Sequence, residues 1–259
     1  MVDRSEILVE RAGPVTLIRF NRPERRNALN MALLHQLHGA LGDVAASDAL
    51  AVVLTGAGDH FCVGADMKAQ RDAPTPSYAE LAPIYETGLM LHEMKQISFA
   101  AIDGGCAGPG LAWAAACDFR FASHRARFNT AFLDVGVSGE MGLAWSLNRI
   151  VGPAWTRELL LCPGRFDAVR AQQMGLITRL FEPEELLAQT MQVAVQTAQR
   201  PPAALAMMKA NILSAERLGL ADYIAIEGAR HAHLATAATL TKGFAAFQSP
   251  NEDNGSQAS

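Results

Sequence analysis

The chain has 259 residues, half of them apolar and 19% charged, and Lys+Arg 22 against Asp+Glu 26 gives a net charge of −4. This length predicts one large domain or two small ones, and the composition is that of a globular protein rather than a disordered chain. The slightly acidic balance argues against a nucleic-acid partner. The longest apolar run, residues 104–117, is shorter than the roughly 20 residues of a membrane-spanning helix.

The first residues carry acids and lack the basic-then-apolar layout of a secretion signal, so we expect a cytoplasmic protein. Beyond them, two short strands at 8–10 and 15–20 flank a turn at residues 12–14. The apolar residues then recur at helical spacing from Met31 to Leu41, and Asn30 is a suitable N-cap.

The middle of the chain alternates strands with helices. Strands are predicted at 51–55, 97–102 and 118–122, and a helix at 84–94 has Pro83 in its first turn. A further helical segment follows the glycine-rich turn at residues 104–110. Repeated strand, helix and strand predict a mostly parallel α/β core.

The last part of the chain is helical by pattern. Helices are predicted at 184–197, 203–215 and 221–235, with Pro201-Pro202 as a break between the first two. We therefore expect a core over residues 1–200 and a helical region over 201–259, whose tail from about residue 251 is disordered.

Neither the cysteines nor the histidines form a metal-binding pattern. The four cysteines lie far apart without a C-x-x-C pair, and we expect buried thiols. The seven histidines have no accompanying carboxylate cluster. We therefore expect no metal.

Three segments carry the functional signal. Residues 21–30 place three arginines ahead of a helix start, which suits phosphate groups but equally fits a solvated loop. Glycine-rich turns at 56–67 and 104–110 each follow a predicted strand, so their backbone N–H groups could converge on one pocket.

Together these segments resemble the enoyl-CoA hydratase/isomerase (crotonase) superfamily over about residues 5–250, as do residues 150–152 and 171–177. The resemblance implies a spiral of ββα units, followed by helices that assemble trimers or hexamers built as dimers of trimers. It also implies an acyl-CoA thioester substrate and a stabilised enolate. Coenzyme A would enter as part of the substrate, with no permanently bound cofactor.

The resemblance implies that two backbone N–H groups stabilise the charge on the thioester oxygen. The first belongs to Ala65, and the family position of the second falls on Pro109, which has no N–H. Gly110 N–H, a bound water or the helix dipole are possible substitutes. Pro109 also fits the first position of a helix, where no N–H is needed.

The two water-activating glutamates of family hydratases correspond to Ala112 and Phe132, neither of which exchanges a proton. Glu140 corresponds to the catalytic acid of several family isomerases. We expect a pocket floored by Phe132 and Trp113 to desolvate Glu140 and raise its pKa. Alternatively, Glu140 is only a favourable carboxylate in a first helical turn.

The resemblance also implies the residues that contact coenzyme A. Arg26 corresponds to the residue at the phosphate or adenine end, and Lys242 could reach a phosphate across a subunit boundary. The remaining expected contacts are Ala28, Ala65, Asp66 and Met67, of which Asp66 is often structural.

Three functions remain open from the sequence. The favoured one is a double-bond shift with Glu140 as the proton shuttle. The second is another reaction in the same pocket, such as hydration, decarboxylation or C–C cleavage. The third is a protein that binds acyl-CoA with little turnover, which the combination of Pro109, Ala112 and Phe132 would explain.

Overall fold

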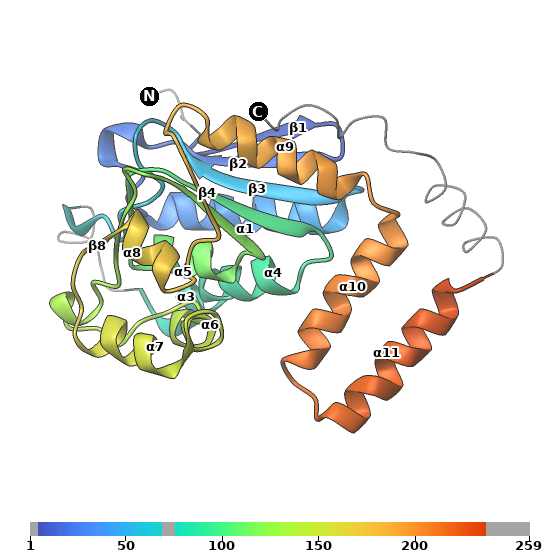
Figure 1. The fold of residues 1–259 in the computed structure, drawn as a ribbon. Coiled ribbons are helices and arrows are strands. Elements are labelled where there is room, and N and C mark those ends of the chain that lie inside the picture. The colour runs from blue at the N-terminus through green and yellow to red at the C-terminus, as the bar shows by residue number, and fades with distance from the viewer. Residues whose placement is uncertain (1–4, 69–75, 237–259) are drawn as a thin grey trace, which may run out of the picture. The chain divides into compact units, whose positions relative to one another are not determined.

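The computed structural model describes residues 5–68 and 76–236, and all structural statements concern these residues. The chain divides into two compact units between Arg200 and Pro201. The first unit holds the strands and most of the helices, and the second holds a pair of helices (Figure 1).

The first unit is built on a six-stranded sheet with the order β1-β2-β3-β4-β6-β9. Its strands are β1 (Ile7–Ala12), β2 (Val15–Phe20), β3 (Ala51–Gly56), β4 (Ile97–Ile102), β6 (Phe119–Ser123) and β9 (Arg179–Phe181). β1 and β2 pair antiparallel, and every other neighbouring pair is parallel. This confirms the prediction of a mostly parallel α/β core.

The sheet is buried in its middle, where β4 has every residue buried. α9 (Leu186–Ala198) packs across β2, β3, β4, β6 and β9, while α1 (Met31–Ala46) packs on β1 and β2 (Figure 1). Continuous apolar strands are expected where both faces of a parallel sheet are covered. α1 begins as predicted, because Asn30 Oδ1 accepts a hydrogen bond from Leu33 N at 2.8 Å.

The helix predicted at 84–94 is instead two helices, α3 (Tyr78–Tyr85) and α4 (Thr87–Glu93). α3 begins at a capping box in which Ser77 N donates to Glu80 Oε2 at 2.7 Å and Glu80 N donates to Ser77 Oγ at 3.4 Å. Pro83 therefore lies inside α3 rather than in a first turn. The cap, which the sequence prediction overlooked, fixes the start of the helix.

A second, smaller sheet has the order β5-β7-β8, formed by β5 (Gly105–Ala107), β7 (Arg127–Asn129) and β8 (Phe166–Asp167). A parallel bridge joins Cys62 to Cys106, and another joins Leu29 to Ala65. The first bridge links the glycine-rich turn at residues 56–67 to β5, and the second links the same turn to Leu29, just before α1. The carboxyl ends of the small sheet's parallel strands therefore meet at one edge.

The remaining elements of the first unit connect and cover these sheets. They are the 3-10 turns η1 (Pro23–Arg25) and η2 (Leu133–Val135) and the helices α5 (Pro109–Ala116), α6 (Leu143–Ile150), α7 (Gly152–Leu161) and α8 (Ala168–Gln173). Cys62, Cys106 and Cys117 are buried as expected, but Cys162 is exposed. The expectation for Cys162 was wrong because it caps the end of α7, where the helix meets solvent.

The second unit is a helical hairpin of α10 (Pro202–Ala215) and α11 (Leu220–Leu234) (Figure 1). Arg230 Nη1 joins the two helices by donating to Asn211 Oδ1 at 2.8 Å and to Ser214 Oγ at 3.0 Å. Large apolar side chains are exposed on both helices, among them Met208 and Ile224. No helix within residues 5–68 and 76–236 is long and apolar enough to cross a membrane.

Candidate active site

The orientation of the Ala65 amide is fixed by a β-bridge between Ala65 and Leu29. Leu29 N donates to Gly64 O at 2.8 Å, and Asp66 N donates to Leu29 O at 2.8 Å. Because a trans peptide places its C=O and N–H on opposite sides, Ala65 N–H points away from Leu29. Among the described residues it donates to no protein acceptor, so it is available to a ligand.

The second glycine-rich turn lies close to Gly64, the residue before Ala65. A Cβ at Gly64, where φ is +95°, would lie 3.4 Å from Ala107 O and 3.8 Å from Pro109 Cδ. Pro109 is the first residue of α5, as the alternative structural interpretation predicts. Since proline donates nothing, the first N–H at this helix end belongs to Gly110.

Gly110 packs closely against Cys62, in the segment that also contains Ala65. A Cβ at this position would lie 2.4 Å from Cys62 O and 2.8 Å from Cys62 Cβ, so only glycine permits this approach. Gly110 N–H has no acceptor within the part of the chain that the structure describes. The two turns therefore meet, with Ala65 N–H and Gly110 N–H as their available donors.

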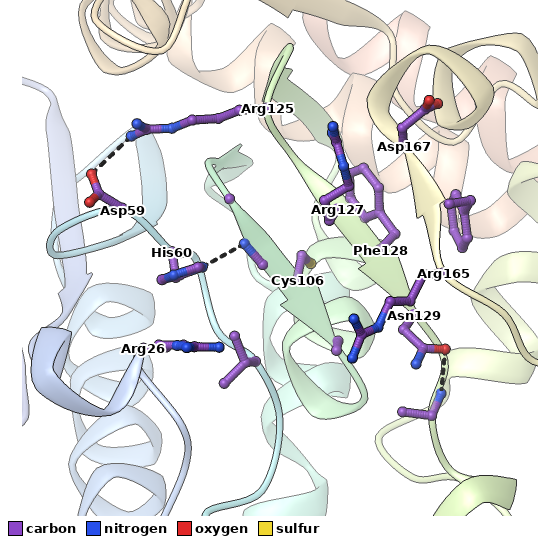
Figure 2. A pocket seen from close by; sticks show the side chains of 16 residues that line it. Arg26, Asp59, His60, Cys106, Arg125, Arg127, Phe128, Asn129, Arg165 and Asp167 are labelled. Carbon is purple, nitrogen blue, oxygen red and sulfur yellow. Dashed lines mark hydrogen bonds and ion pairs between the residues drawn. The ribbon is translucent and has the colours of Figure 1, made fainter.

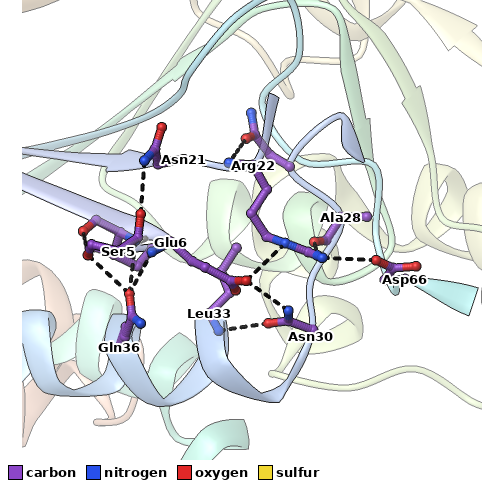
Figure 3. A network of polar contacts seen from close by, with 11 residues as sticks. Ser5, Glu6, Asn21, Arg22, Ala28, Asn30, Leu33, Gln36 and Asp66 are labelled. Carbon is purple, nitrogen blue, oxygen red and sulfur yellow. Dashed lines mark hydrogen bonds and ion pairs between the residues drawn. The ribbon is translucent and has the colours of Figure 1, made fainter. Parts of the chain in front are cut away.

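The buried Arg22 side chain stabilises the segment that contains Ala65 and Asp66 (Figure 3). Arg22 forms ion pairs with Asp66 at 3.1 Å and with Glu6 at 3.3 Å, and its Nη1 donates to Ala28 O. Arg22 and Asp66 are 9% and 6% exposed, so this pair is shielded from solvent. Ala28 and Asp66, expected to contact coenzyme A, thus have a structural role through their carbonyl and carboxylate groups.

Asn27 connects this arginine to the first glycine-rich turn. Its Oδ1 accepts from Arg22 N at 2.9 Å, and its Nδ2 donates to Ala57 O at 2.9 Å and to His60 O at 2.6 Å. Asn27 is fully buried and has a φ of +56°, a conformation that asparagine tolerates better than most residues. It thereby fixes the path of residues 57–60 toward the site.

Phe132 connects Pro109 to the candidate acid. Cβ atoms built at Gly108 and Gly139 would lie 3.9 Å and 3.7 Å from Phe132 ring carbons, so the ring lies between these two glycines. Phe132 is 7% exposed, and the partly buried Glu140 follows Gly139 directly. The structure thus brings Pro109, Phe132 and Glu140 to the same edge of the small sheet.

Glu140 is an acid without a partner among the described residues. Burial raises the pKa of its carboxyl group above the ordinary range of glutamic acid. Within residues 5–68 and 76–236 its side chain has no hydrogen bond and no ion pair. A desolvated carboxyl group with open hydrogen-bonding capacity is characteristic of proton-transfer sites.

Ala112 and Trp113 lie deeper than the other expected pocket residues. Both are fully buried, and the Trp113 indole stacks on Phe20 with ring centroids 5.3 Å apart. Trp113 Nε1 donates to Thr87 Oγ1 at 2.9 Å. Trp113 is therefore packed in the core, and the Phe132 ring lies against Gly139, the residue before Glu140.

A cavity of about 950 Å³ lies on the outward face of the small sheet (Figure 2). Its charged lining consists of Arg26, Asp59, His60, Arg125, Arg127, Arg165 and Asp167. Arg125 is paired with Asp59 at 3.1 Å and with Asp103. Arg26, Arg127 and Arg165 have no carboxylate partner among the described residues, so the cavity is suited to an anion.

His60 joins the two turns at the edge of this cavity. Its Nδ1 accepts a hydrogen bond from Gly105 N at 2.9 Å. Burial, and then the nearby Arg26, lower the pKa of His60. The neutral imidazole with its proton on Nε2 is therefore the form that holds the turns together.

The other expected contact residues are placed less informatively. Met67 is 56% exposed beside the Ala65 strand, and Lys242 lies outside the described residues, as does the tail from about residue 251. No group of three or more His, Cys, Asp or Glu side chains within residues 5–68 and 76–236 could hold a metal ion.

The residues that hold the candidate site in place were not recognised from the sequence. Glu6, Asn27 and His60 act through residues far along the chain, and Arg22 looked the same as its neighbours Arg25 and Arg26. In this segment, only the residue type of Asn27 indicated from the sequence that a residue adopts a positive φ.

The enoyl-CoA hydratase/isomerase family model matches residues 10–253. A probable enoyl-CoA hydratase of Rhizobium meliloti (strain 1021) is 32% identical over 242 residues, covering 93% of this chain and 94% of that protein. The chain therefore belongs to the enoyl-CoA hydratase/isomerase family, the crotonase superfamily.

Solved structures agree with this assignment. The enoyl-CoA hydratase from Bacillus anthracis matches with a TM-score of 0.88 at 27% identity, covering 93% of this chain and 95% of that chain. A putative enoyl-CoA hydratase from Thermobifida fusca YX, solved in complex with CoA, matches with a TM-score of 0.84 at 29% identity, covering 92% and 95%. The fold is therefore the crotonase fold, and the protein is an acyl-CoA enzyme of that family.

Proposed function

We propose that this enzyme shifts a double bond in an acyl-CoA thioester through a stabilised enolate, with Glu140 as the only acid/base. The single observation that carries the proposal is the partly buried Glu140 side chain, which has no hydrogen bond or ion pair among the described residues and follows Gly139, the residue against the Phe132 ring. One carboxyl group suffices for this reaction, because it can take a proton from one carbon and return it to another.

The proton balance of this reaction is closed within the substrate. The Glu140 carboxylate removes a carbon-bound proton, and the electron pair moves onto the thioester oxygen as an enolate. Ala65 N–H donates to that oxygen, with Gly110 N–H as the second donor in place of the missing Pro109 N–H. Collapse of the enolate returns the proton to the carbon two atoms away.

The CoA part of the substrate would be held by the cavity on the small sheet. Val63 and Arg26 line this cavity, and Val63 precedes the Gly64–Ala65 peptide. A residue that lines the cavity therefore directly precedes the peptide of the proposed oxyanion site. Its unpaired arginines suit the phosphate groups of CoA.

Hydration is the second candidate, because similar family members carry the name enoyl-CoA hydratase. Against it stand Ala112 and Phe132, which by the family resemblance correspond to the two water-activating glutamates and cannot activate water. Hydration would therefore need Glu140 to activate water alone.

The test is incubation of 2-enoyl-CoA and 3-enoyl-CoA esters with the enzyme in deuterium oxide, followed by mass spectrometry. We expect double-bond migration and deuterium uptake that Glu140→Gln lowers by at least about 10²-fold. Glu86→Gln, at an exposed acid between α3 and α4, is the matched control and should keep full activity.

Two outcomes would contradict the double-bond shift. Hydrated product that persists in Glu140→Gln would assign the reaction to another water-activating group. CoA-ester binding without any exchange in the unmodified enzyme would identify an acyl-CoA-binding protein instead.

We also propose that the helical region from residue 201 assembles copies of the chain into trimers, or hexamers built from two trimers. The exposed apolar side chains of α10 and α11, such as Met208 and Ile224, support this proposal because they would be covered in an assembly. Sedimentation analysis of the full chain tests it, and a monomer would contradict it.

A further inference from the structure

The junction between α3 and α4 is fixed to the segment that carries Glu140. A Cβ at Gly88, in the first turn of α4, would lie 2.5 Å from Met141 O, so the two backbones are in direct contact. Thr87 Oγ1 lies 3.9 Å from Met141 Sδ and accepts the Trp113 indole N–H. This junction therefore packs directly against the residue that follows Glu140.

Tyr85 lies in this junction, near Glu140. Helical hydrogen bonds continue through the junction, from Glu86 N to Ala82 O at 3.2 Å and from Met90 N to Glu86 O at 2.8 Å. Tyr85 and Gly88 are therefore three residues apart on one helical face, the face that meets Met141. Burial, and then the negative charge of Glu140, raise the pKa of the Tyr85 phenol, in keeping with this proximity.

The phenol of Tyr85 and the carboxyl group of Glu140 have no hydrogen-bond partner among the described residues. Both side chains are half-buried. The nearby Trp113 indole, by contrast, donates to Thr87 Oγ1. Partly exposed polar groups take their hydrogen bonds from water or from a ligand, so these two groups can bind a polar group of a ligand.

The side of Glu140 toward the proposed oxyanion site is apolar. The Phe132 ring stands between Gly139 and Gly108, the residue before Pro109. An acyl chain that runs from the oxyanion site toward Glu140 would meet Phe132 first and Tyr85 and Glu140 next.

We infer that Tyr85 determines substrate specificity, and that the acyl group of the substrate carries a hydroxyl or similar oxygen that binds between Tyr85 and Glu140. Such a hydroxyl accepts a hydrogen bond from the phenol and donates one to a carboxylate oxygen. The second carboxylate oxygen stays available for the carbon-bound proton. This inference rests on the proposed function, because it assumes that the pocket holds an acyl-CoA thioester.

The test measures binding without turnover. Calorimetry compares hexanoyl-CoA with its 4-, 5- and 6-hydroxy derivatives, all saturated, on the full-length protein. We expect at least one hydroxy ester to bind about tenfold more tightly than hexanoyl-CoA. In Tyr85→Phe this preference should fall to within about twofold, while hexanoyl-CoA binding is unchanged.

Tyr78→Phe is the matched control, because Tyr78 lies at the start of the same helix and is 78% exposed. It should keep the full preference. Equal affinity for all four esters, or a preference that survives Tyr85→Phe, would overturn the inference. Failure of the proposed function is seen separately, as absent deuterium exchange with the unsaturated esters.

Discussion

The two turns that meet at the site use their backbones differently. In the Ala65 half, residues 60–66 with the arginine network behind them, an amide N–H is left available and its peptide is fixed by Leu29. In the Pro109 half, residues 104–112 with Phe132 and Glu140, the corresponding position has no N–H. The halves contact one another closely at Gly64, Cys62 and Gly110.

This difference shows that contact geometry and donor chemistry are separable. Glycines at positions 64 and 110 preserve the close approach of the halves, whereas Pro109 removes one donor without disturbing the helix start. The Pro109 half provides an acid instead, since Glu140 lies beside its Phe132 wall. In the proposed reaction, the Ala65 half therefore supplies an N–H donor to the thioester oxygen, and the Pro109 half supplies the acid that transfers the proton.

Removing the support of the Ala65 half should have the largest effect. Arg22→Ala leaves the buried Asp66 carboxylate without its ion pair, which costs about 3 to 5 kcal/mol in the free energy of unfolding. Urea denaturation measures this loss. The exposed Arg25→Ala is the control and should change stability by less than about 0.5 kcal/mol. A loss below about 1 kcal/mol in Arg22→Ala would show that this half does not depend on the pair.

Giving the Pro109 half a donor should make the halves alike. Pro109→Ala restores an N–H at the helix start, and we expect kcat/KM for the exchange reaction to rise about 10- to 100-fold. Pro153→Ala, at an exposed proline in the first turn of α7, is the control and should leave kcat/KM unchanged. An unchanged rate in Pro109→Ala would show that an N–H at position 109 adds nothing to the hydrogen bonds of Ala65 N–H and Gly110 N–H.

The acid of the Pro109 half should reduce stability at neutral pH. Since burial raises the pKa of Glu140, its stabilising contribution is present below the ordinary pKa of glutamic acid, roughly 4.3, and is lost as pH rises through the raised pKa. Glu140→Gln should therefore be more stable at pH 7 by about 0.5 to 1 kcal/mol, or roughly 2 °C in Tm.

Thermal unfolding between pH 4 and pH 8 measures this difference, which should shrink toward the acidic end. Glu86→Gln, at an exposed position, should show no such pH-dependent gain. A Glu140→Gln variant that is less stable than the unmodified protein at pH 7 would indicate a structural carboxylate rather than an acid held for catalysis.

The smallest expected effect concerns His60, whose hydrogen bond from Gly105 N connects the two halves. Burial and Arg26 lower the pKa of His60, so the stability that its neutral form provides is present above the ordinary histidine pKa of roughly 6.5 and is lost as pH falls through the lowered value. Protonation removes the Nδ1 acceptor of Gly105 N–H. The Gly105 amide should therefore exchange several-fold faster, after correction for intrinsic rates, on acidification below pH 6.

Hydrogen exchange followed by mass spectrometry or NMR measures this change. A His124→Asn variant removes an exposed histidine and should leave the pH dependence in place, whereas His60→Asn should abolish it. Protection of Gly105 that stays constant between pH 7 and pH 5 would show that His60 does not join the halves.

Several features followed from the sequence because they depend on neighbours within a few residues. Asn30 caps α1 through Leu33, Pro109 begins α5, and the alternation of strands and helices gives the parallel sheet. The glycine-rich turns also follow strands, as their pattern predicts. Even so, the start of α3 depended on the Ser77–Glu80 box, a local signal that a proline obscured.

Other features were decided only by tertiary contacts. Arg22 meets Asp66 across 44 positions of sequence, and His60 meets Gly105 across 45, so no local pattern distinguishes Arg22 from Arg25 or Arg26. The proximity of Tyr85 to Glu140 likewise depends on the packing of Gly88 against Met141. The sequence thus determined which segments fold and which backbone groups can donate, because both depend on local chemistry. Which side chains are buried, paired or left open to a ligand was determined by the packing of distant segments, which the local chemistry does not specify.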